Sequence, residues 1–176
     1  MIETERLILR PWRGADRAPF AALCADPEVM AHFPATLSRE ESDAVVDRLA
    51  DHQALHGFCF FALERKEDGA FLGFTGLMTL KPENPLQPGV EIGWRLARQA
   101  WGAGYASEAA RAAIEHGFEV LGLAEIVSFT ATENLRSQAV MERIGMTRRA
   151  ELDFDHPAVP EGHRLRPHVV YTTRPR

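Results

Sequence analysis

Val90-Glu91-Ile92-Gly93-Trp94-Arg95-Leu96-Ala97-Arg98-Gln99-Ala100-Trp101-Gly102-Ala103-Gly104-Tyr105-Ala106-Ser107-Glu108-Ala109 carries three local signals in succession. Apolar residues alternate from Val90 to Leu96, which predicts a strand. Gly102 and Gly104 predict a turn, and the alanine-rich segment after them predicts a helix. The first N–H groups of a helix have no intrahelical partner and lie at the positive end of the helix dipole. The stretch therefore predicts a phosphate site built from main-chain donors.

Two segments of the chain resemble one known family. Gln99 to Gly104 fits the Gln/Arg-x-x-Gly-x-Gly/Ala signature of the GCN5-related N-acetyltransferases (GNAT family), and Trp101 to Ala109 resembles the branch that acetylates N-termini of ribosomal proteins. Glu133 to Ser137, followed by Met141 to Met146, resembles the next cofactor segment of that family. The resemblance implies a single N-acetyltransferase domain over residues 1–176. Its expected fold is α/β, with a mixed α+β sheet of about seven strands, a splayed central strand pair and about four helices.

The same resemblance implies that acetyl-CoA is bound as co-substrate. In the family the glycine loop wraps the pyrophosphate, the strand before it pairs with the pantetheine arm, and an asparagine and a serine lie near that arm and the thiol. The positions implied here are Trp94, Arg95, Leu96, Gln99, Ala100, Trp101, Gly102, Ala103, Gly104, Tyr105, Ala106, Asn134 and Ser137. Asn134 and Ser137 also suit a purely structural role as helix-cap residues.

Met141 departs from the family pattern. Many members carry a tyrosine at this position that protonates the departing CoA thiolate, and a methionine has no proton to donate. Three routes stay open: Ser137 protonates the thiolate, water does so, or the thiolate leaves unassisted. Ser137 is therefore one of two candidate catalytic residues.

Glu91 is the other candidate, as general base. An amine must be neutral to attack a thioester, and Glu91 lies on the strand expected to carry the acetyl group. A solvated or purely structural role for the carboxylate would explain Glu91 nearly as well. In the last loop, Asp153, Asp155, His156, Glu161 and His163 form a polar cluster whose spacing matches no metal-ligand motif, so no metal is expected. We assign His156 to acceptor recognition.

The composition of the chain limits the classes of protein and partner that remain. With 176 residues, 45% hydrophobic and 26% charged, the chain has the composition of one globular domain. A net charge of -5 argues against nucleic acid and favours a basic peptide or amine as partner. No apolar run approaches the roughly 20 residues that cross a membrane. The acidic N-terminal residues do not resemble a signal peptide, so a cytoplasmic location is expected.

The rest of the chain predicts alternating elements around the glycine turn. Further strands are predicted at 6–12, 58–63, 70–80, 125–130, 147–154 and 169–173. Asp16, Ser38 and Asn134 are predicted to cap three further helices. Ser38 and Glu41 form a capping-box pattern, and Gly57 suits the end of that helix. Cys24 and Cys59 are expected to be buried thiols.

The leading interpretation is an enzyme that acetylates a primary amine, either a protein N-terminus or a small molecule, by direct attack in a ternary complex. A homodimer is an expectation drawn from the family alone. One alternative is a non-catalytic CoA-binding or regulatory module, which the absence of the tyrosine permits. Another is a nicotinamide-linked oxidoreductase, because Gly102 to Ser107 nearly matches the dinucleotide pattern, with Ser107 in place of the third glycine.

Overall fold

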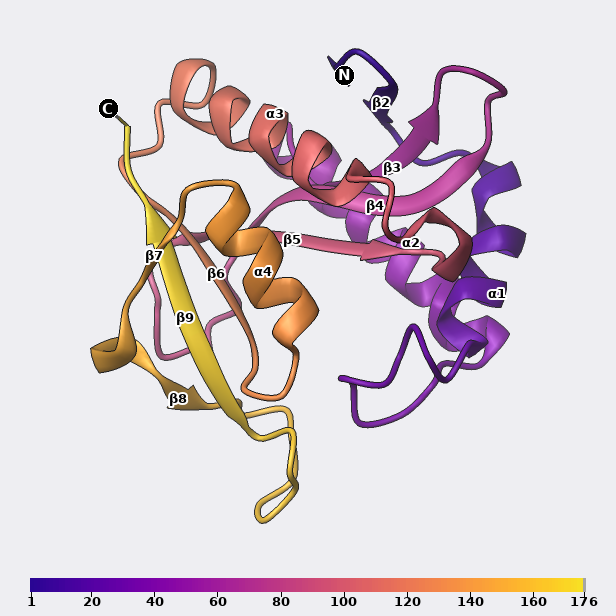
Figure 1. The fold of residues 1–176 in the computed structure, drawn as a ribbon. Coiled ribbons are helices and arrows are strands. Elements are labelled where there is room, and N and C mark those ends of the chain that lie inside the picture. Colours follow the sequence, from indigo (N-terminus) through magenta and orange to yellow (C-terminus); the bar gives the residue numbers. More distant parts are fainter. Residues whose placement is uncertain (176) are drawn as a thin grey trace.

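The computed structural model describes residues 1–175 and contains one mixed sheet with helices on both faces (Figure 1). The strand order is β1-β2-β3-β4-β5-β6-β9-β7, and β8 pairs with β9. The strands are β1 (Ile2–Glu3), β2 (Leu7–Arg10), β3 (Phe60–Arg65), β4 (Phe71–Thr79), β5 (Val90–Leu96), β6 (Ile126–Ala131), β7 (Thr147–Arg148), β8 (Phe154–Asp155) and β9 (Pro167–Thr173). The helices are α1 (Arg17–Ala25), α2 (Arg39–His56), α3 (Tyr105–Glu119) and α4 (Leu135–Arg143), with short 3₁₀ turns at Gly14–Asp16, Arg98–Ala100 and Ala150–Leu152.

The predicted order of elements and the four helices are confirmed, but the strand at 147–154 is divided. Its two ends form β7 and β8, and the 3₁₀ turn Ala150–Leu152 lies between them. The Asp153 carboxylate explains the break, because it accepts hydrogen bonds from the Val170 N–H (3.1 Å) and from Arg148 (2.7 Å). The Asp153 side chain thus takes the place of a main-chain hydrogen-bond partner for Val170 of β9. The short strand β1, which pairs with β2, also lies outside the prediction.

α3 packs closely on one face of the sheet, called here the α3 face. Ala109, Ala110 and Ala113 are fully buried against it. A Cβ atom added at Gly117 would lie 2.8 Å from side-chain atoms of both Ile126 and Leu77. The small residues therefore let the helix backbone approach the sheet.

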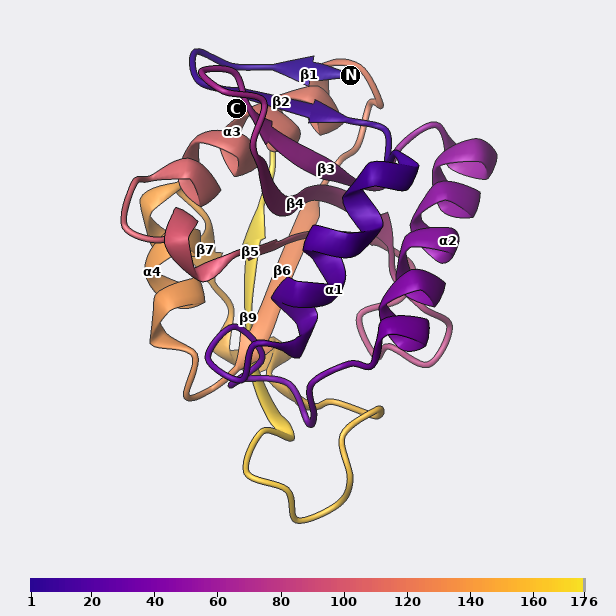
Figure 2. The ribbon, with the colours of Figure 1, turned by 90° about the vertical axis from the view of Figure 1, so that its right-hand side faces the viewer.

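α1 and α2 cover the opposite face, called here the α1/α2 face, over its β2 to β5 half (Figure 2). The predicted capping box of α2 is confirmed: the Glu41 N–H donates to Ser38 Oγ (3.1 Å), and the Ser38 N–H donates to the Glu41 carboxylate (2.7 Å). Gly57 ends α2 in the left-handed region, also as predicted. Asp16 stands at the predicted N-cap position of α1, but its side chain makes no capping hydrogen bond, because its carboxylate binds the Arg10 guanidinium at 2.7 and 2.8 Å.

β5 and β6 are parallel and pair at one position only, Glu91 with Val127. Beyond this point, called here the vertex, the two strands separate (Figure 1). The Ser128 hydroxyl of β6 donates to the Ile92 carbonyl of β5 (3.0 Å) and fixes the vertex. The predicted splayed pair is confirmed. Within residues 1–175, no helix is long and apolar enough to cross a membrane.

Candidate active site

The turn before α3 forms an open cradle of main-chain donors. Gly102 and Gly104 both have φ near +80°, a region that favours glycine. The first hydrogen bond of the helix runs from the Glu108 N–H to the Gly104 carbonyl, and the main-chain N–H groups from Gly102 to Ser107 have no partner among residues 1–175. A Cβ atom at Gly102 would meet nothing within 4 Å. Unpaired donors around open space fit a pyrophosphate group, and hence the cofactor implied by the sequence.

Arg6 supports this loop from behind, a role that the sequence did not reveal. Its guanidinium donates to the Ala103 carbonyl (3.0 Å), pairs with Glu108 (2.6 Å) and lies 4.7 Å from the centre of the Tyr105 ring. Arg6 is 97 residues from Ala103, and no local pattern connects the two. We therefore regard Arg6 as a support of the loop conformation.

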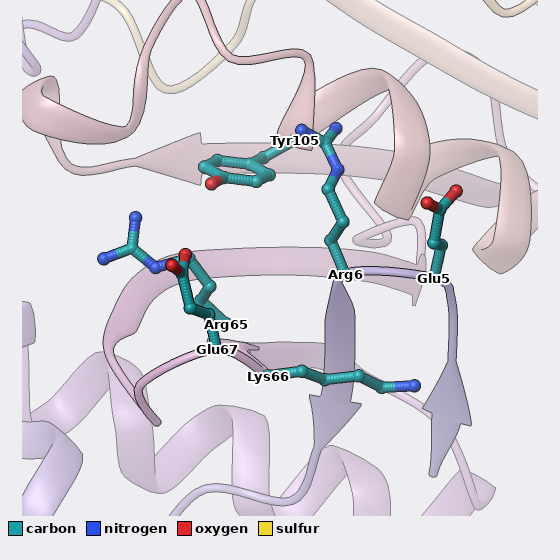
Figure 3. A pocket seen from close by; sticks show the side chains of 6 residues that line it. All are labelled: Glu5, Arg6, Arg65, Lys66, Glu67 and Tyr105. Carbon is teal, nitrogen blue, oxygen red and sulfur yellow. The ribbon is translucent and has the colours of Figure 1, made fainter.

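A surface hollow of about 320 Å³ lies beside Arg6 and Tyr105, and Figure 3 shows its lining. Its cations already have acidic partners: Arg6 pairs with Glu108, Arg65 with Asp68 (2.6 Å) and Lys66 with Glu3 (3.1 Å). Tyr105 lines this hollow and also contributes its main-chain N–H to the neighbouring cradle.

β5 offers free main-chain groups where β6 has moved away. The Ala97 N–H donates to the Leu72 carbonyl of β4, and in an antiparallel ladder alternate residues point to the same neighbour. Trp94 and Leu96 therefore point away from β4, towards the opening beyond the vertex. The Leu96 carbonyl accepts from the Trp101 indole (2.9 Å), so the Trp94 groups and the Leu96 N–H remain available. The main-chain groups of Arg95 point to β4, and its side chain lies on the α1/α2 face.

The second predicted cofactor segment closes the other side of this opening. Asn134 caps α4: its carbonyl oxygen accepts from the Ser137 N–H (3.3 Å), and its amide donates to Thr130 Oγ1 (2.8 Å) and Ser137 Oγ (3.0 Å). The Ser137 oxygen acts as acceptor in the last bond, so its own proton is free for another partner. Arg136 lies over the Trp101 ring at 4.4 Å and links α4 to the glycine turn. The structure thus brings the two predicted cofactor segments together.

Met141 is only 1% exposed and belongs to the apolar core beneath α4. At the position where many members of the family carry a tyrosine, this chain therefore has a packed apolar side chain.

Glu91 lies on the α1/α2 face at the vertex, opposite Ile92. It is half-buried, and its carboxylate has no hydrogen bond or ion pair with any residue from 1 to 175. Burial raises the pKa of Glu91 to about 7, although the Lys81 charge acts in the opposite direction. A carboxyl group with this pKa can accept a proton near neutral pH.

His156 belongs to a compact cluster of four rings, called here the ring cluster: Phe129, Phe154, His156 and His168. The ring centres lie 4.8 to 6.1 Å apart. Strand register places the cluster on the same face as Glu91, because Glu91 pairs with Val127 and Phe154 pairs with His168. Burial, followed by His168, lowers the pKa of His156 to about 4, so its ring is neutral at pH 7. Its Nδ1 accepts from the Ala158 N–H (3.2 Å).

The other polar residues of the last loop do not gather around His156. Asp153 pairs with Arg148 (2.5 Å), Asp155 pairs with Arg166 (3.3 Å), and His163 Nδ1 accepts from the Leu165 N–H (3.2 Å). Across residues 1–175, no group of three or more His, Cys, Asp or Glu side chains is arranged to hold a metal ion. No local sequence signal marks the other three rings of the cluster, because each comes from a different strand: Phe129, Phe154 and His168.

Comparison with known proteins gives a consistent result. A family model described as an acetyltransferase (GNAT) domain matches residues 6–147. The FsC-acetyl coenzyme A-N(2)-transacetylase of Aspergillus fumigatus is 32% identical over 172 residues, covering 92% of this chain and 72% of the relative.

Solved structures of acetyltransferases share the fold of this chain. An acetyltransferase of the GNAT family from Bacillus anthracis is 26% identical with a TM-score of 0.81, covering 98% of this chain and 97% of that one. RimL, a ribosomal L7/L12 α-N-protein acetyltransferase in complex with coenzyme A, has the same fold, with a TM-score of 0.77 at 17% identity and coverage of 97% and 95%.

Proposed function

Because the chain belongs to the GNAT acetyltransferase family, we propose that it transfers the acetyl group of acetyl-CoA to a primary amine, either a protein N-terminus or a small molecule. One observation carries this proposal: β5 and β6 pair at a single residue and then separate, and the far end of β5 leads into unpaired main-chain donors. An acyl-CoA needs both features, an anion cradle and a strand edge beside an extended pantetheine arm.

Acetyl-CoA supplies an activated thioester. The N–H groups of Gly102 to Ser107 hold its pyrophosphate, and the free groups of Trp94 and Leu96 hold the pantetheine arm. Asn134 contributes by exchanging one of its present hydrogen bonds, since its amide already serves Thr130 and Ser137. Gln99, Ala100 and Trp101 shape the entry to the loop.

Glu91 serves as the general base. An alkylamine resembles lysine, whose pKa is about 10.4, so nearly all of it is protonated at pH 7. Glu91 takes one proton from the ammonium group, directly or through one water, which gives the neutral amine. The amine nitrogen then forms a bond to the acetyl carbon, and its second proton passes to water as the carbon–sulfur bond breaks. The raised pKa of Glu91 suits this transfer at neutral pH.

Ser137 gives its free hydroxyl proton to the sulfur as the carbon–sulfur bond breaks, and recovers a proton from water. The hydrogen bond from Asn134 to the Ser137 oxygen leaves that proton available and orients the hydroxyl. The buried Met141 takes no part in proton transfer.

The acceptor approaches from the α1/α2 face, where Glu91 and the ring cluster lie. The neutral rings, His156 among them, form one wall of the acceptor site. Aromatic faces attract cations, so they also suit an incoming ammonium group.

The experiment combines calorimetry with thiol release. The protein should bind acetyl-CoA and release free thiol only when an amine from a panel of small amines and N-terminal peptides is supplied. Gly104→Val should abolish CoA binding. Gly122→Val is the matched control, because Gly122 also has a positive φ (+67°) and open space but lies beyond the other end of α3.

Equal CoA binding by folded Gly104→Val protein would contradict the site. CoA binding without thiol release for any amine would favour a non-catalytic CoA-binding module instead. Binding of NAD and not of CoA would favour the dinucleotide alternative.

A further inference from the structure

Arg95 is a cation without an acidic partner on the α1/α2 face. Its one hydrogen bond within residues 1–175 runs from Nη1 to the thiol of Cys24 (3.3 Å). Its Nε atom is buried with no partner at all. Arg10 shows the contrast, since its side chain is only 5% exposed and pairs with both Asp16 (2.7 Å) and Glu64 (2.6 Å). Buried charges without partners are costly, and their retention commonly reflects a ligand.

Two aromatic rings hold the Arg95 guanidinium in place. Its central carbon lies 4.2 Å from the centre of the Phe33 ring and 5.3 Å from that of the Phe74 ring. Phe33 belongs to the segment between α1 and α2, and its side chain is 39% exposed. The rings supply no hydrogen-bond acceptor for the N–H groups, so Nε and Nη2 have no acceptor among residues 1–175 and suit a planar anion.

Arg95 lies on the same face as Glu91, with Gly93 between them. The register with β4 shows this, because Phe74, Gly76 and Met78 pair with Arg95, Gly93 and Glu91. Four residues along a strand separate Cα atoms by roughly 13 Å. Gly93 offers no side chain, and the Phe60 ring covers it on this face, 2.9 Å from where a Cβ would stand.

Three groups therefore follow one another along this face: the Glu91 carboxyl group, the apolar Phe60 ring and the Arg95 cation. We propose that Arg95 binds a carboxylate of the acceptor, so that the acceptor is an amino acid or other amine that carries a carboxylate. This inference rests on the proposed acetyl transfer. The methylene groups between amine and carboxylate would lie over the Phe60 ring, which covers Gly93. The negative net charge of the chain favours a basic acceptor, but the charge at this position is local and positive.

The test compares ω-amino acids with one to five methylene groups against the corresponding ω-amino amides. The wild-type protein should acetylate the best acid at least tenfold more efficiently, as kcat/KM, than its amide. Arg95→Met should remove this preference by raising the KM of the acid, with the KM of acetyl-CoA changed less than twofold. Arg39→Met is the control: Arg39 is an exposed arginine on α2 that pairs with Asp43 (2.8 Å), and the preference should persist.

Arg95→Met should also keep or raise the melting temperature, because it removes an unpaired buried charge. A structural arginine would instead give a lower melting temperature and equal losses for acid and amide. An unchanged preference in Arg95→Met, or a rise confined to the KM of acetyl-CoA, would overturn the proposal.

Failure of the proposed acetyl transfer would look different. If no amine is acetylated, binding still decides the role of Arg95: the acid, and not the amide, should raise the melting temperature of wild-type protein but not of Arg95→Met. Equal effects of acid and amide on the wild type would overturn carboxylate recognition independently of catalysis.

Discussion

At the scale of single residues, Glu91 and Arg95 are ionisable side chains that have no ion-pair partner within residues 1–175. Arg10 and Asp16, by contrast, satisfy each other although both are buried. A protein gains stability by pairing such groups or by replacing them with apolar ones. Glu91 and Arg95 therefore reduce stability, and strain of this kind is typical of binding and catalytic positions.

Glu91→Gln should lower turnover by about 10²- to 10⁴-fold at pH 7, the usual contribution of a general base. The deficit should shrink as pH rises, because the free amine then loses its proton without help. Steady-state rates from pH 6 to 10 measure this. If Glu91 only attracts the ammonium, the variant will show a raised acceptor KM and nearly unchanged kcat; unchanged rates throughout would leave Glu91 a structural carboxylate.

The same variant should be more stable than the parent in alkaline solution. The native pKa of Glu91, about 7, lies above its usual value of 4.5, so the native state holds a proton that the unfolded state has lost. Stability therefore falls as pH rises from about 4.5 to 7, by at most about 3 kcal/mol. Urea unfolding should show Glu91→Gln gaining stability at pH 8 and much less at pH 5. A gain that is equal at both pH values would contradict the raised pKa.

Ser137→Ala should lower kcat by roughly ten- to a hundredfold, at or below the lower limit usual for an acid catalyst because a CoA thiolate is a good leaving group. The KM of acetyl-CoA should change little, since Asn134 keeps its bond to Thr130. A loss below about threefold would leave Ser137 with its capping role only. Pre-steady-state measurement of thiol release separates this step from product release.

At the scale of elements, the opening between β5 and β6 shows what local sequence can predict. The alternation from Val90 to Leu96 and the glycines after it define the strand, the turn and the start of α3. The partners that hold these elements lie far away in the chain, such as Arg6 behind the glycine turn. Their contacts depend on tertiary packing, which carries no local pattern.

Ser128→Ala should weaken both the fold and the cofactor site. The Ser128 hydroxyl satisfies the Ile92 carbonyl at the vertex, and a buried carbonyl left without a partner costs about 1–3 kcal/mol. We expect a lower urea midpoint and weaker binding of acetyl-CoA, because the spacing of β5 and β6 is no longer fixed. Ser42→Ala is the matched control: Ser42 is equally buried, but its hydroxyl has no partner. Similar losses in both variants would contradict this role for Ser128.

At the scale of the whole molecule, sequence predicted the order of elements and the two cofactor segments but not the acceptor face. That face combines β5, β6, β8 and β9 with the segment between α1 and α2. Phe33, Phe129 and His168 meet there only after folding. Of the residues on this face, the sequence marks Glu91 from its strand and His156 from a polar loop. It also marks Arg95, but as a cofactor position.

The histidines make the stability of the molecule depend on pH in mildly acidic solution. Burial is the first cause that lowers the pKa of His32, His52, His116, His156 and His168 below the usual value of 6.5. Below pH 6.5 these histidines therefore bind more protons in the unfolded chain than in the native state, and the free energy of unfolding falls as pH decreases. Glu91 has the opposite effect between pH 7 and 4.5, since its native form takes up a proton first.

Five groups outweigh one, so the free energy of unfolding should decrease steadily from pH 6.5 towards pH 5. Urea titrations at intervals of 0.5 pH unit measure the slope, which gives the number of protons taken up on unfolding. We expect a net uptake of protons on unfolding near pH 5.5. His156→Phe should reduce this slope, because it removes the histidine whose pKa lies near 4 while retaining a ring beside Phe129 and His168. His163→Phe, at a histidine in the same loop outside the ring cluster, is the control for placing a phenylalanine in this loop. A slope that stays near zero down to pH 5 would mean that these five rings accept protons in the native state as readily as in the unfolded chain.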